Sequence, residues 1–123
     1  MRELSHYRGM PSQVRIGCFI FDVVVGGNLE HQVLTNSYGF MAPTLKRIGI
    51  SEGLSPIEVA NTFIHECMHA IHLVYGLMRD CDEASPTEEE YTTLTANGLC
   101  AFWQDNPKAC AWWSKLLKIG GEN

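Results

Sequence analysis

The stretch "TFIHECMHAIH", residues 62–72, places several ionisable side chains inside an otherwise apolar run. His65 and His69 are four residues apart, so a helix would stack them on one face about 6 Å apart. Two imidazole nitrogens at that spacing can converge on one zinc ion, Zn2+, with bonds of about 2.0–2.1 Å. Glu66 would lie beside the metal, where its carboxylate could accept a proton from a bound water. The H-E-x-x-H pattern therefore predicts two metal ligands and a general base.

A metal would also solve an energetic problem of this stretch. A helix this apolar is expected to face a core, and a buried imidazole or carboxylate without a partner costs about 1–3 kcal/mol. Binding to zinc would offset the cost of burying the two imidazoles, and the zinc-bound water would be the partner of the carboxylate. The alternative is a chance match, with core-facing histidines satisfied by backbone carbonyls. The position of the pattern in mid-helix, behind a helix-capping sequence, argues against chance.

The neighbouring residues limit the site. His72 continues the same face, but it lies about 10 Å along the axis from His65 and is expected outside the ligand set. It also stands where the longer pattern H-E-x-x-H-x-x-G-x-x-H requires glycine, and Tyr75 stands in place of the third histidine. The chain is therefore not expected to be a metzincin. Cys67 is expected to act as a small packing residue.

A catalytic zinc site needs a third protein ligand, and the segment "SPTEEEYTTLTANGLCAFW" offers three glutamates. Ser85-Pro86-Thr87-Glu88 resembles a capping box, which would engage Glu88 at the helix start. Glu90 is the preferred ligand because its helical stripe adjoins the apolar one, and Glu89, on a more polar stripe, is the alternative. All three could instead simply complement the helix dipole. Weaker candidates in the preceding loop are Asp80, Cys81 and Asp82.

The first part of the chain reads as strands. Residues 14–25, "VRIGCFIFDVVV", are rich in β-branched and aromatic residues and predict one strand that ends at Gly26-Gly27. Two short strands are expected at 38–41 and 46–50, with a turn at Ala42-Pro43-Thr44. Residues 28–36 fit no single element.

The second part reads as helices. The first begins with a capping box at Ser55 and Glu58 and ends near Gly76. A second is expected from Ser85 to about Gln104, and a third from Asn106-Pro107. The stripe expected to face the core in the first helix is Ile57, Ala60, Ile64, Met68, Ile71 and Tyr75.

Strands followed by helices predict an α+β fold. We expect a small N-terminal antiparallel sheet packed on the H-E-x-x-H helix and on two further C-terminal helices. With 123 residues, the chain is expected to form a single domain over residues 1–123.

Composition argues against other classes of protein. A net charge of -5 disfavours binding to nucleic acid, which depends on Lys and Arg clusters. The C-terminal aromatic residues are expected in the core rather than on a base-stacking surface. Five cysteines without a C-x-x-C pair predict reduced thiols and a cytoplasmic protein. Neither a signal peptide nor a bilayer-spanning segment is expected.

"TFIHECMHAIH", followed about twenty residues later by "EEEYTTLTANGL", resembles small gluzincin-type zinc metallopeptidases, in particular ImmA/IrrE-like and SprT-like proteins, many of them encoded by phages. "YGFMAPTLKRIGISEGLSP" resembles the strand pair before their active helix, and the similarity covers residues 38–107. The resemblance implies a minimal zincin-like fold, with a zinc-dependent endopeptidase activity and a sheet edge that holds an extended peptide. A DNA-binding extension and a helix-turn-helix region, which many such proteins carry, are not evident.

The expected function is hydrolysis of a peptide bond in a protein or peptide substrate by a metal-activated water, with Glu66 as base. The alternative is a catalytically silent, zinc-containing binding or regulatory module, of a kind that phages encode, because a short chain leaves little room for a cleft. His72, Tyr75 and Tyr91 are eligible to stabilise the oxyanion, and the sequence does not choose among them.

Overall fold

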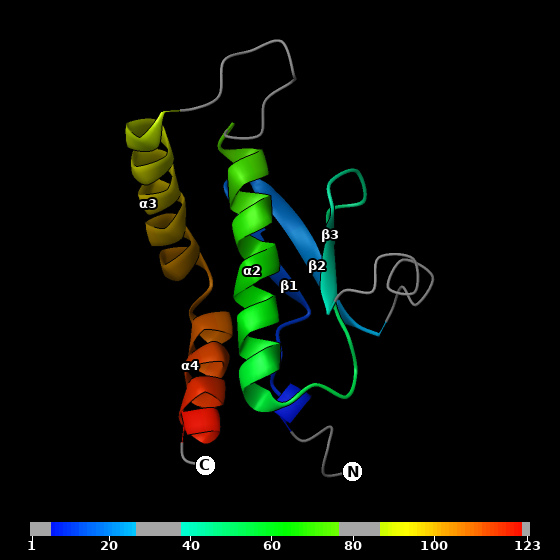
Figure 1. Cartoon of the computed structure of the whole chain (residues 1–123). Coiled ribbons are helices and arrows are strands. Elements are labelled where there is room, and N and C mark those ends of the chain that lie inside the picture. Colours follow the sequence, from blue (N-terminus) through cyan, green and yellow to red (C-terminus); the bar gives the residue numbers. More distant parts are fainter. Residues whose placement is uncertain (1–5, 27–37, 77–86, 122–123) are drawn as a thin grey trace.

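The computed structural model describes residues 6–26, 38–76 and 87–121 (Figure 1). Four strands come first: β1 (Gln13–Ile16), β2 (Phe19–Val25), β3 (Gly39–Ala42) and β4 (Arg47–Ile50). Three helices follow: α2 (Pro56–Val74), α3 (Glu88–Asp105) and α4 (Pro107–Gly121). The predicted α+β class is confirmed. None of these helices is both long enough and apolar enough to cross a bilayer.

The strands form one sheet in the order β1-β2-β4-β3. The β1–β2 and β3–β4 pairs are antiparallel, whereas β2 and β4 run parallel. The sheet is therefore mixed, and not wholly antiparallel as expected, because the β3–β4 hairpin inserts its second strand beside β2. Within the described residues β3 pairs only with β4, so β3 forms one edge of the sheet.

The prediction of one strand over residues 14–25 is wrong, because the chain turns back at Gly17-Cys18. Ile16 pairs with Phe19 across this two-residue loop, and Gly17 has a φ of 62°. A two-residue hairpin loop needs a positive φ at its first position, which glycine adopts without strain. Both strands of this hairpin are rich in strand-forming residues, so composition alone predicted one continuous strand.

One face of the sheet packs under α2. The strands alternate, so that Val14, Phe21 and Ile48 point to the same side and are almost fully buried. On α2 the buried residues are Val59, Ala60, Thr62, Phe63, Glu66, Cys67, Ala70 and Ile71. The stripe predicted to start at Ile57 is partly wrong, because Ile57 is 46% exposed. Helix α2 contacts the sheet as well as α3 and α4, so its buried sector is wider and turned relative to the predicted one (Figure 1).

Helix α3 begins differently from the prediction. Thr87 is the N-cap and Glu90 is the N3 residue, with both hydrogen bonds of a capping box present. The expectation that Glu88 fills this position is wrong. The sequence holds two overlapping capping signatures, Ser85 to Glu88 and Thr87 to Glu90, and the second starts the helix. The α2 capping box at Ser55 and Glu58, and the α4 start at Pro107, are confirmed.

Helices α2 and α3 approach closely at Gly98, which is buried within α3. A Cβ atom added there would lie 2.5 Å from Ile71 Cγ2. The same stretch of α3 brings Phe102 to Phe63, with 6.4 Å between ring centroids. The two helices are therefore antiparallel neighbours, and a glycine permits their contact.

Gly98→Ala tests this contact. In an open helix the change would stabilise by about 1 kcal/mol through propensity, but here we expect a loss of about 1–3 kcal/mol from overpacking. Chemical denaturation measures the difference in the free energy of unfolding. Ala96→Gly, at an exposed site on the same helix, is the control and should cost about 1 kcal/mol by propensity alone. A more stable Gly98→Ala protein would contradict the close packing.

Tyr7 holds the N-terminal segment against the connection between β4 and α2. Its hydroxyl donates to the Ser51 carbonyl at 2.6 Å and accepts from the Leu54 N–H at 3.2 Å. Burial raises the pKa of Tyr7, and the nearby Glu52 and Glu58 act in the same direction, whereas the hydrogen bond from Leu54 lowers it. The folded protein thus prefers the neutral phenol.

We expect Tyr7→Phe to lose about 1–2 kcal/mol of stability near pH 7 through these two hydrogen bonds. Because the folded pKa is raised, the contribution of Tyr7 is complete below the unfolded pKa of about 10 and declines as the pH rises through the folded value. Urea denaturation from pH 7 to 11 should show the gap between the two proteins narrowing above pH 10. A gap that widens with pH would contradict the assignment.

Candidate metal centre

His65 and His69 face one another on adjacent turns of α2. Their Nε2 atoms are 3.2 Å apart, and the rings meet edge to face with centroids 4.8 Å apart. The helical spacing fixes the positions of the two Cα atoms, and the side-chain rotamers then turn both Nε2 atoms to the same point. The two nitrogens thus lie within hydrogen-bonding distance of each other on the face of the helix that they were predicted to share, and their binding of a metal stays a prediction.

The environment of the two histidines differs from the expectation. Both rings are exposed, so the idea that they are buried in a core is wrong. The buried residue is Glu66 instead, with only 8% of its surface accessible to solvent. The buried sector of α2 ends between these neighbours, leaving the imidazoles open to solvent and the carboxylate largely shielded from it.

Glu66 and His65 share a cavity of about 200 Å³ with the start of β3 and the preceding turn of α2. The other lining residues are Tyr38, Gly39, Asn61 and Thr62. These four lining residues were not predicted from the sequence. Asn61 and Thr62 precede His65 by four and three residues on one helix, and this spacing could have suggested them. Tyr38 and Gly39 come from another element, and only the fold brings them here.

Gly39 allows the edge strand to lie against α2. A Cβ atom there would meet Thr62 Cγ2 and the Gly49 carbonyl oxygen, each at 2.6 Å, and would approach Glu66 Cγ at 3.4 Å. Any larger residue would push β3 away from the helix. The wall of the cavity beside the carboxylate is therefore the backbone of an edge strand.

The residues considered for the oxyanion lie elsewhere. His72 pairs with α3: its Nε2 lies 3.4 Å from Thr95 Oγ1, and its ring meets Tyr91 at a centroid distance of 5.7 Å. Burial lowers the pKa of His72, and His69 lowers it further. Tyr75 lies close to Gly98 and Gly17. None of the three lines the cavity of Glu66.

Cys67 has the packing role that was predicted. It is fully buried within the core, and burial, followed by the nearby Glu66 and Cys110, raises the pKa of its thiol well above the usual value. A neutral, buried thiol is a poor metal ligand. The donors available on this part of α2 are the two imidazoles.

Glu90 lies apart from the histidine pair in this arrangement. Its Oε1 accepts a hydrogen bond from the Thr87 N–H at 2.9 Å at the start of α3. Thr95 and Tyr91 of α3 both contact His72, so the first turns of α3 lie beside the end of α2 that follows His69. Among the described residues, no three His, Cys, Asp or Glu side chains are grouped to hold a metal. Asp80, Cys81 and Asp82 lie outside the described residues.

Replacement of Glu90 by alanine separates its two possible roles. As a capping residue it should contribute about 0.5–1 kcal/mol to stability, whereas as a metal ligand it should control zinc affinity. We expect Glu90→Ala to lower the stability of the metal-free protein more than Glu89→Ala, which removes an exposed carboxylate of the same helix turn outside the capping box. Zinc affinity measured on both variants then identifies the ligand. Equal stability of the two metal-free variants would contradict the capping assignment.

The comparisons with known proteins add no family. The chain matches no family model, and neither a curated protein nor a solved structure shows significant similarity to it. Its function must therefore be inferred from the residues and their geometry.

Proposed function

We propose that the protein is a zinc-dependent endopeptidase that uses His65 and His69 as metal ligands and Glu66 as the general base. The observation that carries this proposal is the convergence of the two Nε2 atoms, 3.2 Å apart, beside a carboxylate that shares a cavity with His65. The H-E-x-x-H pattern and the resemblance to gluzincin-type peptidases point to the same chemistry.

The distance between the nitrogens suits a single ion. Two ligands bound tetrahedrally at about 2.0–2.1 Å are separated by about 3.3–3.4 Å, close to the 3.2 Å seen here. Both rings are exposed, so an ion could reach them without rearrangement of the core. Zinc in this position would lower the pKa of water towards about 7 and polarise a carbonyl oxygen.

Glu66 is suited to move the proton. Its carboxylate is mostly shielded from solvent yet opens on the cavity that contains His65. From there it can take a proton from the attacking water and deliver it to the leaving amine. A purely structural zinc site would have no use for a carboxylate in this place.

The substrate class follows from the resemblance to gluzincin-type peptidases, which implies a sheet edge that holds an extended peptide. Gly39 brings β3 against the helix that carries the base, so a strand backbone forms one wall of the cavity beside Glu66. We therefore propose a protein or peptide substrate in extended conformation.

The third zinc ligand remains part of the proposal. Glu90 would have to exchange its place in the capping box for the metal, and Glu89 is the alternative. Water or substrate would fill the remaining position.

A second candidate function is a zinc-bearing binding module without activity. It is favoured by the finding that the described residues contain no complete group of three ligands. Two imidazoles alone would hold an ion weakly, as suits a site completed by a partner.

Glu66→Gln tests the peptidase. Loss of the base should lower cleavage of a peptide library by about 10²–10⁴-fold while the zinc content stays that of the wild type. Glu52→Gln, an exposed carboxylate outside the cavity, is the control and should keep full activity. Mass spectrometry of the products and elemental analysis give the two readouts.

Equal cleavage by Glu66→Gln and wild type would contradict the assigned base. A wild type that holds zinc and cuts nothing would instead support the binding module.

A further inference from the structure

A second cavity, of about 290 Å³, lies at the end of the molecule where α2 begins and α4 ends. Three segments that are far apart in the sequence form it: the residues before β1, the first residue of α2 and the second half of α4 (Figure 1). The lining residues are His6, Arg8, Pro56, Trp112, Lys115, Leu116 and Ile119. None of them lines the cavity of Glu66, so the two cavities are separate.

The wall that α4 contributes is both apolar and cationic. Its four residues, Trp112, Lys115, Leu116 and Ile119, have the spacing i, i+3, i+4, i+7, which places them on one face of the helix. Trp112 and Leu116 are almost completely buried. Ile119 is 39% exposed, and Lys115 is exposed as well. The cavity therefore has an apolar floor with an ammonium group beside it.

Hydrogen bonds hold the N-terminal segment against both helices. His6 Nε2 donates to the Leu54 carbonyl at 2.6 Å, just before α2. Trp112 Nε1 donates to the His6 carbonyl at 3.1 Å. Arg8, two residues after His6, thereby lines the same cavity as Lys115. The walls are formed without a ligand, so binding would not require these segments to become ordered.

The lining of this cavity is positively charged. It contains the guanidinium of Arg8 and the ammonium of Lys115 and, among the described residues, no carboxylate. No described residue forms a hydrogen bond or an ion pair with either cation. Glu58 is outside the lining, and its carboxylate accepts from the Ser55 N–H. The partial charges at the start of α2 and the end of α4 have opposite signs, so the two cationic side chains determine the charge of the site.

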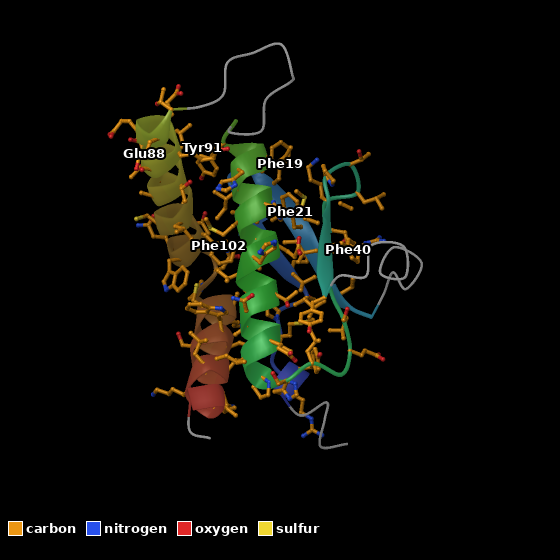
Figure 2. The ribbon with its side chains drawn as sticks, viewed as in Figure 1. Phe19, Phe21, Phe40, Glu88, Tyr91 and Phe102 are labelled. Carbon is orange, nitrogen blue, oxygen red and sulfur yellow. The ribbon has the colours of Figure 1, made fainter. Side chains whose placement is uncertain are left out.

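The opposite end of the molecule is acidic. The first turn of α3 carries Glu88, Glu89 and Glu90, and Figure 2 shows Glu88 at the end farthest from the start of α2. The whole chain has a net charge of -5, so its overall field repels anions. A cationic cavity in such a protein is a local feature that would attract an anion to this end.

We propose that this cavity binds a small organic anion with a carboxylate at one end and an apolar chain at the other, such as a medium-chain fatty acid. Arg8 and Lys115 bind the carboxylate through charge-assisted hydrogen bonds. The apolar chain covers Leu116 and Ile119. A volume of about 290 Å³ is at the lower limit for small-molecule sites, which favours a short ligand. The inference is independent of the proposed peptidase.

Calorimetric titration of the full chain with octanoate tests the proposal. We expect a single octanoate per chain, bound at least about tenfold tighter than octanamide, which keeps the apolar chain but lacks the charge. Acetate and inorganic phosphate carry negative charge without the chain and should also bind at least about tenfold more weakly. The indole N–H signal of Trp112 in NMR spectra should shift on binding. That of Trp103, which is exposed and outside the cavity, should not.

Matched variants separate the cavity from general effects of charge. Lys115→Gln and Arg8→Gln should each weaken octanoate binding about five- to tenfold, and both side chains are exposed, so the fold should tolerate the changes. Lys118→Gln removes the same charge from α4 outside the cavity and should leave the affinity unchanged. Ile119→Ala should weaken octanoate binding about three- to tenfold. Ile20→Ala, at a similarly exposed residue of β2, should not.

Octanoate that binds no tighter than octanamide, or phosphate that binds as tightly as octanoate, would overturn the proposal. An equal loss of affinity in Lys115→Gln and Lys118→Gln would overturn it as well, because a general charge effect would then explain the binding. These measurements need neither zinc nor peptide cleavage, so their outcome is distinguishable from a failure of the proposed function.

Discussion

The site depends on the four-residue spacing of two histidines on a helix whose orientation the core fixes. Phe63, Ala70 and Ile71 are completely buried on α2, so rotation of the helix about its axis would expose large apolar surface. With that face held inward, His65 and His69 must emerge on the open side, and Glu66 must lie at the border between the two. The chemistry thus follows from a local periodicity that the packing of the whole domain holds in place.

Helix α2 is held in position by close contacts with β3 on one side and with α3 on the other. Gly39 lets the edge strand contact Thr62, and Gly98 lets α3 contact Ile71. Between them, the helix is bounded by a strand backbone on one side and a helix backbone on the other. A third glycine, Gly49, lies under the ring of Phe40, which covers it from the paired strand. Small residues at these points set the distances on which the cavity beside Glu66 depends.

Local rules predicted much of this fold from the sequence. The Ser55 capping box, the Gly76 stop and the order of strands before helices needed only near neighbours, and each is confirmed. The convergence of His65 and His69 likewise needs no more than one helix. Where two local signals overlapped, as at Ser85 and Thr87, propensity could not decide between them.

The remaining features depend on contacts between distant segments. The exposure of Ile57, the parallel pairing of β2 with β4 and the part played by Tyr38 in the cavity arise from tertiary packing, which periodicity in one element does not encode. The third ligand could not be predicted from the sequence for a similar reason. A glutamate such as Glu90 can either cap the start of a helix or bind a metal, and the residue type alone does not distinguish the two roles. Elements were therefore easier to predict than their relative placement.

Zinc stoichiometry tests the central claim most directly. Elemental analysis of protein reconstituted with zinc and freed of excess metal should give one zinc per chain for wild type and for His72→Ala. The same analysis should give little or none for His65→Ala and His69→Ala, since each removes one of the converging nitrogens. Wild-type protein that takes up no zinc, or histidine variants that retain it in full, would contradict the account.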